Sequence, residues 1–233
     1  MRRDPRQARG ATQQPLLQRD WPWRACLLSG GASRRMGRDK ALLPHPEGGC
    51  WLERCLGLLA GQGMPVTLLS RHQEHRELAQ ALAHRQQLAI EALDEPPPWE
   101  GPLRALARLM AHHPHQRLLL CPVDMPALTA DVLQDLRAAA ATAAEGGAND
   151  GDGDGENEGG PIVLAHDGER LQPLLGVYPS SEALRSDLDH FLAGGGRRLQ
   201  GWLARHPHRP LHLASEALRN INHPEGPLTA KAR

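Results

Sequence analysis

The stretch ACLLSGGASRRMGRDKALL, residues 25–43, places an apolar run directly before two glycines and a basic loop. The run is short, apolar and bounded by glycine, which predicts a buried β-strand. Three more apolar runs follow, and a stretch with helical spacing of apolar residues comes after each run. Strands are expected at 25–29, 65–70, 88–93 and 117–124, and helices at 51–63, 73–85, 103–113 and 129–145. This alternation predicts an α/β fold with a doubly wound, mostly parallel sheet and helices on both faces.

The chain returns to ordered patterns after an acidic segment of low complexity. Two strands are expected at 161–166 and 171–179, and the turn DGER between them predicts a hairpin. Helical patterns at 181–195 and 197–207 and an apolar strand at 209–215 follow.

Two segments are expected to lie outside the folded core. Residues 1–22 are polar and lack the apolar stretch of a secretory signal, which predicts a flexible N-terminal tail. Residues 145–160 carry six acidic residues and no basic one, which predicts a disordered surface insertion. The alternative, a calcium loop, lacks the regular ligand pattern. We therefore expect a single domain over 23–228, with one half at 23–144 and the other at 161–228.

Composition argues against several classes of function. The 233 residues include 27 basic and 27 acidic side chains, so the chain has no net positive charge that would favour binding to nucleic acid. No apolar run approaches the roughly 18 residues of a membrane helix. The basic charge is concentrated, however: residues 1–44 carry ten Arg or Lys against three Asp, which favours an anion site there. Cys26, Cys50, Cys55 and Cys121 show no zinc-ligand spacing and are expected to be reduced thiols of a cytoplasmic protein.

The loop after the first strand has the chemistry of a phosphate site. Gly30 and Gly31 place no Cβ between the backbone N–H groups and a ligand. Arg34, Arg35 and Lys40 add positive charge that suits phosphate oxygens. The spelling is neither G-x-x-x-x-G-K-[ST] nor G-x-G-x-x-G, which excludes the P-loop and dinucleotide fingerprints. The alternative is a solvated basic turn.

Two carboxylates are expected at the same edge of the sheet. Asp94 follows the third strand, and Asp124 follows the fourth within CPVDMP. Ligands of doubly wound sheets bind at the carboxyl ends of the strands, where the glycine loop also lies. A carboxylate facing an anion-binding loop can hold Mg²⁺ against a triphosphate. The alternative for Asp124 is an acid at the start of a helix.

Five segments in order carry a family resemblance. They are LLSGGASRRMGRDKALL at 27–43, DEPPPWEGPLRAL at 94–106, LLLCPVDMPAL at 118–128, LQPLLGVYP at 171–179 and NINHPE at 220–225. They resemble the signatures of the molybdenum cofactor guanylyltransferases (the MobA family), among them L-x-G-G-x-S-x-R-M-G-x-D-K-A-L and D-x(6)-G-P-L. The resemblance spans about residues 24 to 226 and implies a Rossmann-like nucleotidyltransferase fold.

The resemblance implies transfer of GMP from GTP to the terminal phosphate of molybdopterin, with release of pyrophosphate. The half at 23–144 would bind GTP, and the half at 161–228 would bind molybdopterin. The attacking phosphate is ionised at neutral pH, so positioning and charge neutralisation would do most of the catalysis. Mg²⁺ is the implied cofactor. GTP and molybdopterin are the implied partners, and molybdoenzymes or their chaperones are further candidates.

Roles for single residues come from the same resemblance. The catalytic residues would be Arg35, Lys40 and Asp124, and Asp124 would also bind Mg²⁺. The nucleotide would be bound by Leu28, Ser29, Gly30, Gly31, Arg34, Lys40, Asp94 and Asp124. The pterin would be bound by Gln172, Arg197, Arg198, Asn220 and Asn222. For this last group structural roles remain open, such as a strand edge, a helix start or a turn before Pro224.

The sequence departs from the family at the second strand. The segment VTLLSRHQ, residues 66–73, has no Asn where the family often contacts the nucleotide, so that contact is lost or Ser70 supplies it. Two other functions remain open: a cytidylyl- or sugar-nucleotidyltransferase, and a non-catalytic GTP-binding adaptor in cofactor maturation. A preference for GTP over CTP and ATP would distinguish a guanylyltransferase from the related transferases. The presence of both Lys40 and Asp124 argues against a non-catalytic adaptor.

Overall fold

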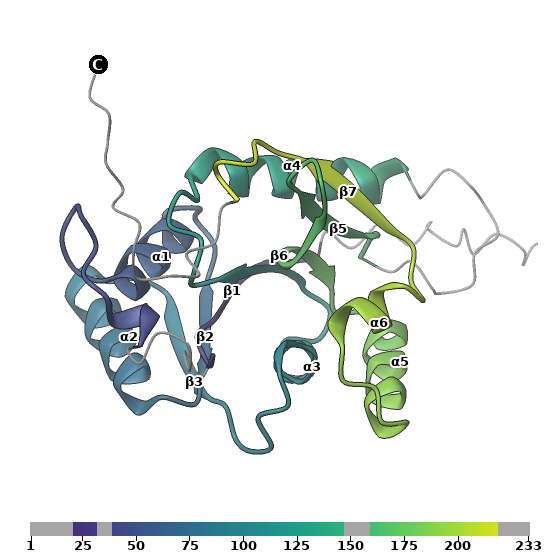
Figure 1. The fold of residues 1–233 in the computed structure, drawn as a ribbon, viewed down its shortest axis with the longest axis horizontal. Helices are drawn as coiled ribbons and strands as arrows, with labels where there is room; N and C mark the ends of the chain where they lie inside the picture. The colour runs from purple at the N-terminus through teal and green to yellow at the C-terminus, as the bar shows by residue number, and fades with distance from the viewer. Residues whose placement is uncertain (1–20, 32–38, 147–158, 219–233) are drawn as a thin grey trace, which may run out of the picture.

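A computed structural model describes residues 21–31, 39–146 and 159–218, which form one seven-stranded sheet covered by helices on both faces (Figure 1). The strands are β1 (Trp23–Leu28), β2 (Val66–Ser70), β3 (Ile90–Asp94), β4 (Arg117–Pro122), β5 (Ile162–His166), β6 (Leu171–Pro179) and β7 (His208–His212). The helices are α1 (Trp51–Ala60), α2 (Gln73–Gln86), α3 (Pro102–His112), α4 (Ala130–Gly146), α5 (Glu182–Ala193) and α6 (Leu199–Leu203), with a 3-10 turn η1 (Lys40–Leu42). The predicted α/β fold class is confirmed.

The sheet has the order β3-β2-β1-β4-β6-β5-β7 and is mostly parallel. β1 pairs in parallel with β2 and β4, and β2 pairs in parallel with β3. β6 runs antiparallel to both of its neighbours, β4 and β5. The chain moves outward from β1 through β2 to β3 and then returns to place β4 on the other side of β1. The order therefore reverses between β1 and β4, which is where ligands bind in open α/β sheets.

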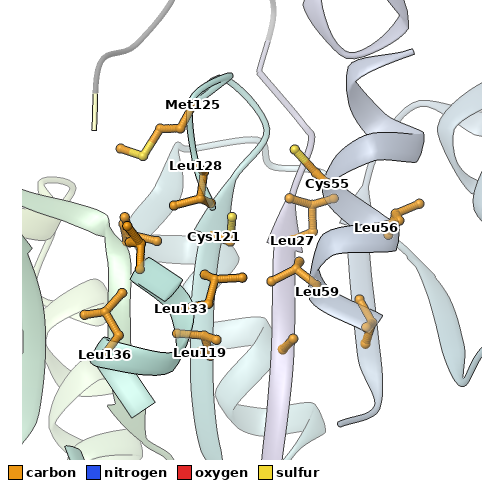
Figure 2. Close-up of a cluster of buried hydrophobic side chains, with 14 of the residues drawn as sticks. Leu27, Cys55, Leu56, Leu59, Leu119, Cys121, Met125, Leu128, Leu133 and Leu136 are labelled. Carbon is orange, nitrogen blue, oxygen red and sulfur yellow. The ribbon is translucent and has the colours of Figure 1, made fainter. Parts of the chain in front are cut away.

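Each face of the sheet has its own hydrophobic core. Side chains alternate along a strand, so Leu27 and Leu119 point into the core under α1, α2 and α4, whereas Cys26 and Leu120 point into the core under α3, α5 and α6. Figure 2 shows the first core, in which leucines of α1 and α4 lie over β1 and β4. Burial on both faces explains why the central strands read as continuous apolar runs.

The hairpin predicted beyond residue 160 is confirmed by the antiparallel pairing of β5 with β6. The Asp167 carboxylate closes its turn by accepting hydrogen bonds from the backbone N–H groups of Glu169 and Arg170, both at 2.9 Å. The helix predicted over 197–207 is shorter than expected, because Arg198 is the N-cap of α6 and Ala204 its C-cap.

The four cysteines are free thiols, and all four are buried. Burial raises the pKa of Cys26 and of Cys55 to about 12, so these thiols stay protonated and unreactive. Cys26 belongs to one hydrophobic core, and Cys50, Cys55 and Cys121 belong to the other. Within the described residues, none of the helices combines the length and apolar character that crossing a bilayer requires.

Candidate active site

A cavity of about 400 Å³ opens at the carboxyl ends of the parallel strands. Its walls come from the ends of β1, β2 and β4, from η1, and from the loop between β3 and α3. Six of the residues predicted from the sequence line it: Leu28, Ser29, Gly30, Gly31, Lys40 and Asp124. The fold thus brings together, at the switch point, residues that are almost 100 positions apart in the chain.

A cation and a carboxylate face each other on the β4 side of this cavity. Lys40 Nζ lies 3.9 Å from Asp124 Oδ2. Desolvation raises the pKa of Asp124, and the charge of Lys40 opposes that rise. A carboxylate in such a setting gains from a further cation. Mg²⁺ typically takes one or two protein carboxylates and fills its shell with phosphate oxygens and water, so Asp124 fits this ion.

The two ends of the glycine loop are tied together by His75, a buried residue of α2. His75 Nε2 lies 2.9 Å from Asp39 Oδ2, just before Lys40. His75 Nδ1 lies 3.0 Å from the Ser29 carbonyl oxygen, at the start of the loop. Asp39 in turn caps η1 by accepting a hydrogen bond from the Ala41 N–H. His75 therefore fixes the position from which Lys40 enters the cavity. Arg34 and Arg35 belong to 32–38, outside the described residues.

The acids after β3 take different positions. Asp94 is the last residue of β3, its side chain is 65 % exposed, and its carboxylate lies 2.8 Å from Arg76 Nη1. It is not among the residues that line the cavity. The next residue, Glu95, lines the cavity and is only 7 % exposed. The nucleotide contact assigned to Asp94 stays a prediction, and Glu95 is a cavity residue that the sequence pattern did not single out.

Ser70 has a structural role in this structure. Its hydroxyl is buried and donates to the Ser29 carbonyl oxygen at 2.8 Å, and it accepts from the His72 N–H at 3.2 Å. The cavity is lined instead by the following residue, Arg71. The segment without Asn therefore presents the guanidinium of Arg71 to the cavity, and not the hydroxyl of Ser70.

The predicted pterin residues are spread over the second half of the sheet. Gln172 donates to Asp167 at 2.6 Å within the β5–β6 turn. Arg197 lies 3.5 Å from Glu100, in the loop that borders the cavity, and Arg198 caps α6. β6 reaches the cavity through Leu174. Asn220 and Asn222 lie outside the described residues.

A second group could hold a metal, but it lies away from the cavity. Glu91 of β3 and His112 and His113 at the end of α3 place their ligand atoms within 4.8 Å of one another. α3 begins at the cavity and runs away from it, so its last residues lie near the amino ends of the parallel strands. Arg24 Nη1 is 3.6 Å from Glu91, and this fixed charge opposes a cation there. A second hollow, along α5, is lined by that helix alone.

Comparisons with known proteins identify relatives of this chain. A family model, the MobA-like NTP transferase domain, matches residues 25–210. A probable molybdenum cofactor guanylyltransferase of Rhodopirellula baltica is 32 % identical over 215 residues, which are 87 % of this chain and 89 % of that protein. Another, from Mycobacterium tuberculosis, is 35 % identical over 213 residues, 89 % of this chain and 88 % of that protein.

Solved structures share the fold at lower identity. Molybdopterin-guanine dinucleotide biosynthesis protein A of Archaeoglobus fulgidus matches with a TM-score of 0.57 and 17 % identity, over 86 % of this chain and 93 % of that one. A nucleotidyl transferase from Methanothermobacter matches with a TM-score of 0.59 and 18 % identity, over 87 % of this chain and 92 % of that one. The resemblance inferred from the five sequence segments is confirmed. The chain belongs to the MobA-like NTP transferase family and is a nucleotidyltransferase.

Proposed function

We propose that the protein transfers GMP from GTP to molybdopterin, with or without bound molybdenum, and releases pyrophosphate. The product is the guanine dinucleotide form of the molybdenum cofactor. The observation that carries the proposal is the convergence of Lys40, Asp124 and the Gly30–Gly31 turn in one cavity at the switch point. Relatives named as molybdenum cofactor guanylyltransferases support the choice of nucleotide and acceptor.

The charges at the β4 side of the cavity suit the proposed reaction. An oxygen of the molybdopterin phosphate bonds to the α-phosphorus of GTP, and the bond from that phosphorus to the bridging oxygen breaks. The electron pair leaves with pyrophosphate. Lys40 neutralises charge that develops on the phosphates, and Arg35 is proposed to do the same. Asp124 would hold Mg²⁺, which would neutralise further charge on the phosphates when bound. The acceptor is already ionised, so the protein mainly orients the two phosphates.

The acceptor is proposed to enter from the side of β6 and α6. Leu174 of β6 lines the cavity, and Arg197 contacts the loop that borders it through Glu100. Both belong to the half at 161–228, to which the pterin is assigned, with Gln172, Arg198, Asn220 and Asn222 as further candidate contacts. A cytoplasmic location, and molybdoenzymes or their chaperones as receivers of the product, belong to the same proposal.

Product analysis tests this function. The wild-type protein is incubated with Mg²⁺, molybdopterin and GTP labelled at the α-phosphorus. The label is expected in a guanine dinucleotide of molybdopterin, identified by mass spectrometry. Binding of GTP without transfer of label would favour the adaptor, and transfer from CTP instead would identify a cytidylyltransferase.

Asp124→Asn tests the metal assignment. The amide keeps the shape of the side chain but removes the charge that holds Mg²⁺, so we expect transfer to fall by about 100-fold or more. The rate is measured over a Mg²⁺ titration. Asp131→Asn, an exposed acid at the start of α4, is the matched control and should behave as wild type. Full activity of Asp124→Asn in Mg²⁺ would remove this role.

A further inference from the structure

We propose that Glu95, Arg71 and Trp99 form a guanine-reading subsite at the β3 side of the cavity. The inference rests on the proposed function and names the residues that set its nucleotide preference. All three line the cavity, at the end opposite to Lys40 and Asp124.

The sheet order gives the cavity two chemically different ends. Lys40 and Asp124 lie on the β4 side of β1, and Arg71 and Glu95 follow β2 and β3 on its other side. β3 and β4 are three strand spacings apart, roughly 14 Å. A nucleoside triphosphate laid across these strand ends has its phosphates at the β4 end. Its base then lies at the β3 end.

The Glu95 carboxylate is buried and held in place. Arg108 Nη1 of α3 lies 3.1 Å from Glu95 Oε1, and Arg108 Nη2 donates to the Pro98 carbonyl at 3.1 Å. The other oxygen, Oε2, lies against the first glycine of the nucleotide loop, since a Cβ on Gly30 would collide with it. A fixed carboxylate oxygen is thus presented where the loop leaves β1.

Two guanidinium groups act on the Glu95 carboxyl. Burial raises its pKa above the ordinary value, and the charges of Arg108 and Arg71 oppose that rise without cancelling it. An ionised carboxylate only accepts hydrogen bonds, whereas a guanidinium only donates them. The subsite therefore offers acceptors from Glu95 beside donors from Arg71.

Guanine is the base that matches this arrangement. Its N1–H and 2-amino group are adjacent donors for a carboxylate, and its O6 and N7 accept from arginine. Adenine and cytosine instead place a ring-nitrogen acceptor beside the amino group, which a carboxylate repels. Hypoxanthine keeps N1–H but lacks the 2-amino donor. A comparison of GTP with ITP therefore measures the contribution of the 2-amino group alone.

An aromatic surface completes the subsite. Trp99 is 53 % exposed, and its indole N–H donates to the Glu95 carbonyl at 2.7 Å, which fixes the ring beside the carboxylate. The Arg71 guanidinium lies 5.1 Å from the ring centroid. Stacking of a base on such a ring tolerates any base, so Trp99 adds affinity and Glu95 adds selectivity.

The test compares Glu95→Gln with wild type for GTP, ITP, XTP and ATP. The amide presents an NH₂ group to the 2-amino group of guanine but can donate to the 2-oxo group of xanthine. We expect kcat/KM for GTP to fall about 10- to 100-fold, the GTP-to-ITP ratio to approach one, and XTP to become a better substrate. Glu77→Gln, an exposed glutamate of α2, is the matched control and should match wild type.

Two further experiments distinguish failure of the subsite from failure of the proposed reaction. If Asp94→Asn abolishes the GTP-to-ITP preference while Glu95→Gln keeps it, the subsite is overturned and Asp94 reads the base. Calorimetry measures the affinity of each variant for the same nucleotides, and this measurement does not require the transfer reaction. Loss of guanine preference in Glu95→Gln, in a protein that binds GTP but transfers nothing, would support the subsite and refute only the proposed reaction. Unchanged unfolding midpoints establish that the variants are folded.

Discussion

Lys40 places a cation beside Asp124, where the phosphates of a bound nucleotide would lie. Lys40→Ala removes that charge but leaves the cap of η1, which Asp39 provides. We therefore expect kcat to fall by about 100-fold or more, because the charge on the leaving phosphates loses its partner. The unfolding free energy should change by less than about 1 kcal/mol.

Steady-state kinetics and urea unfolding of the same preparations check this expectation. Lys40→Arg is the matched variant, since it retains the charge with a different shape, and it should keep part of the activity. Wild-type turnover in Lys40→Ala would contradict the assignment of the loop.

Single residues were predictable from the sequence where a strand end fixed their position. Asp124 directly follows β4, whose end must lie beside the end of β1, so its place near the glycine loop could be expected. Lys40 comes well after β1 in the chain, and its position depends on the contact between His75 and Asp39.

That Glu95 and not Asp94 lines the cavity could not be predicted, because Glu95 lies beyond the end of β3, where the alternation of a strand no longer fixes the direction of a side chain. Which acid enters the cavity depends on the ion pairs with Arg76 and Arg108, and these come from helices packed on the sheet.

Among the elements, the glycine loop depends most on its anchor in α2. His75 is buried and bridges Ser29 and Asp39, so His75→Leu should remove the ring partner of the buried Ser29 hydroxyl and of the Asp39 carboxylate. We expect a loss of about 1–3 kcal/mol of stability and a KM for GTP that rises more than kcat falls. Gln80→Ala, exposed on the same helix, is the control.

Kinetics at saturating molybdopterin separate KM from kcat, and urea unfolding gives the stability. A destabilised His75→Leu protein with unchanged KM and kcat would show that the histidine only supports the core. Its role was not predictable from the sequence, since its partners lie 36 and 46 positions away in the chain.

The elements themselves were largely predictable, because their apolar patterns reflect burial on one or both sides. The four strand–helix units and the β5–β6 hairpin appear where the patterns indicated. The position of β6 between β4 and β5 could not be read from the pattern, since an apolar strand carries no record of its neighbours. The C-terminal end of α6 could not be predicted either, because the helix ends at its C-cap, Ala204, before the apolar pattern does.

The stability of the whole molecule should depend on pH through His113. Burial lowers its pKa to about 4, with help from Arg24 and His112, and Glu91 opposes this. Between about pH 6.5 and 4 the unfolded chain binds a proton that the folded one rejects. Stability is therefore lost as the pH falls through this range, by at most about 3 kcal/mol, and no such loss occurs above it.

Urea unfolding at pH 7 and pH 4.5 measures the effect. His113→Gln should show a smaller difference between the two pH values than wild type. His84→Gln, exposed near the end of α2, should keep the wild-type difference. An undiminished difference in His113→Gln would assign the acid sensitivity to other groups.

The described residues that flank the acidic segment 147–158 lie on the side away from the cavity. α4 ends at Gly146 after running back from the end of β4, and Arg117, the first residue of β4, donates to the Gly159 carbonyl at 3.1 Å. Replacing 147–158 by a Gly/Ser segment of equal length should therefore change kcat/KM for GTP less than twofold. A large loss would place the segment at the site.

Guanylyl transfer at this cavity must release pyrophosphate from GTP, so pyrophosphate release is its direct readout. The rate is measured for GTP, CTP and ATP with Mg²⁺, in the presence and absence of molybdopterin. We expect release from GTP that requires molybdopterin, and little from the other two nucleotides. Release from CTP in preference to GTP, or no release from any of the three despite GTP binding, would contradict it.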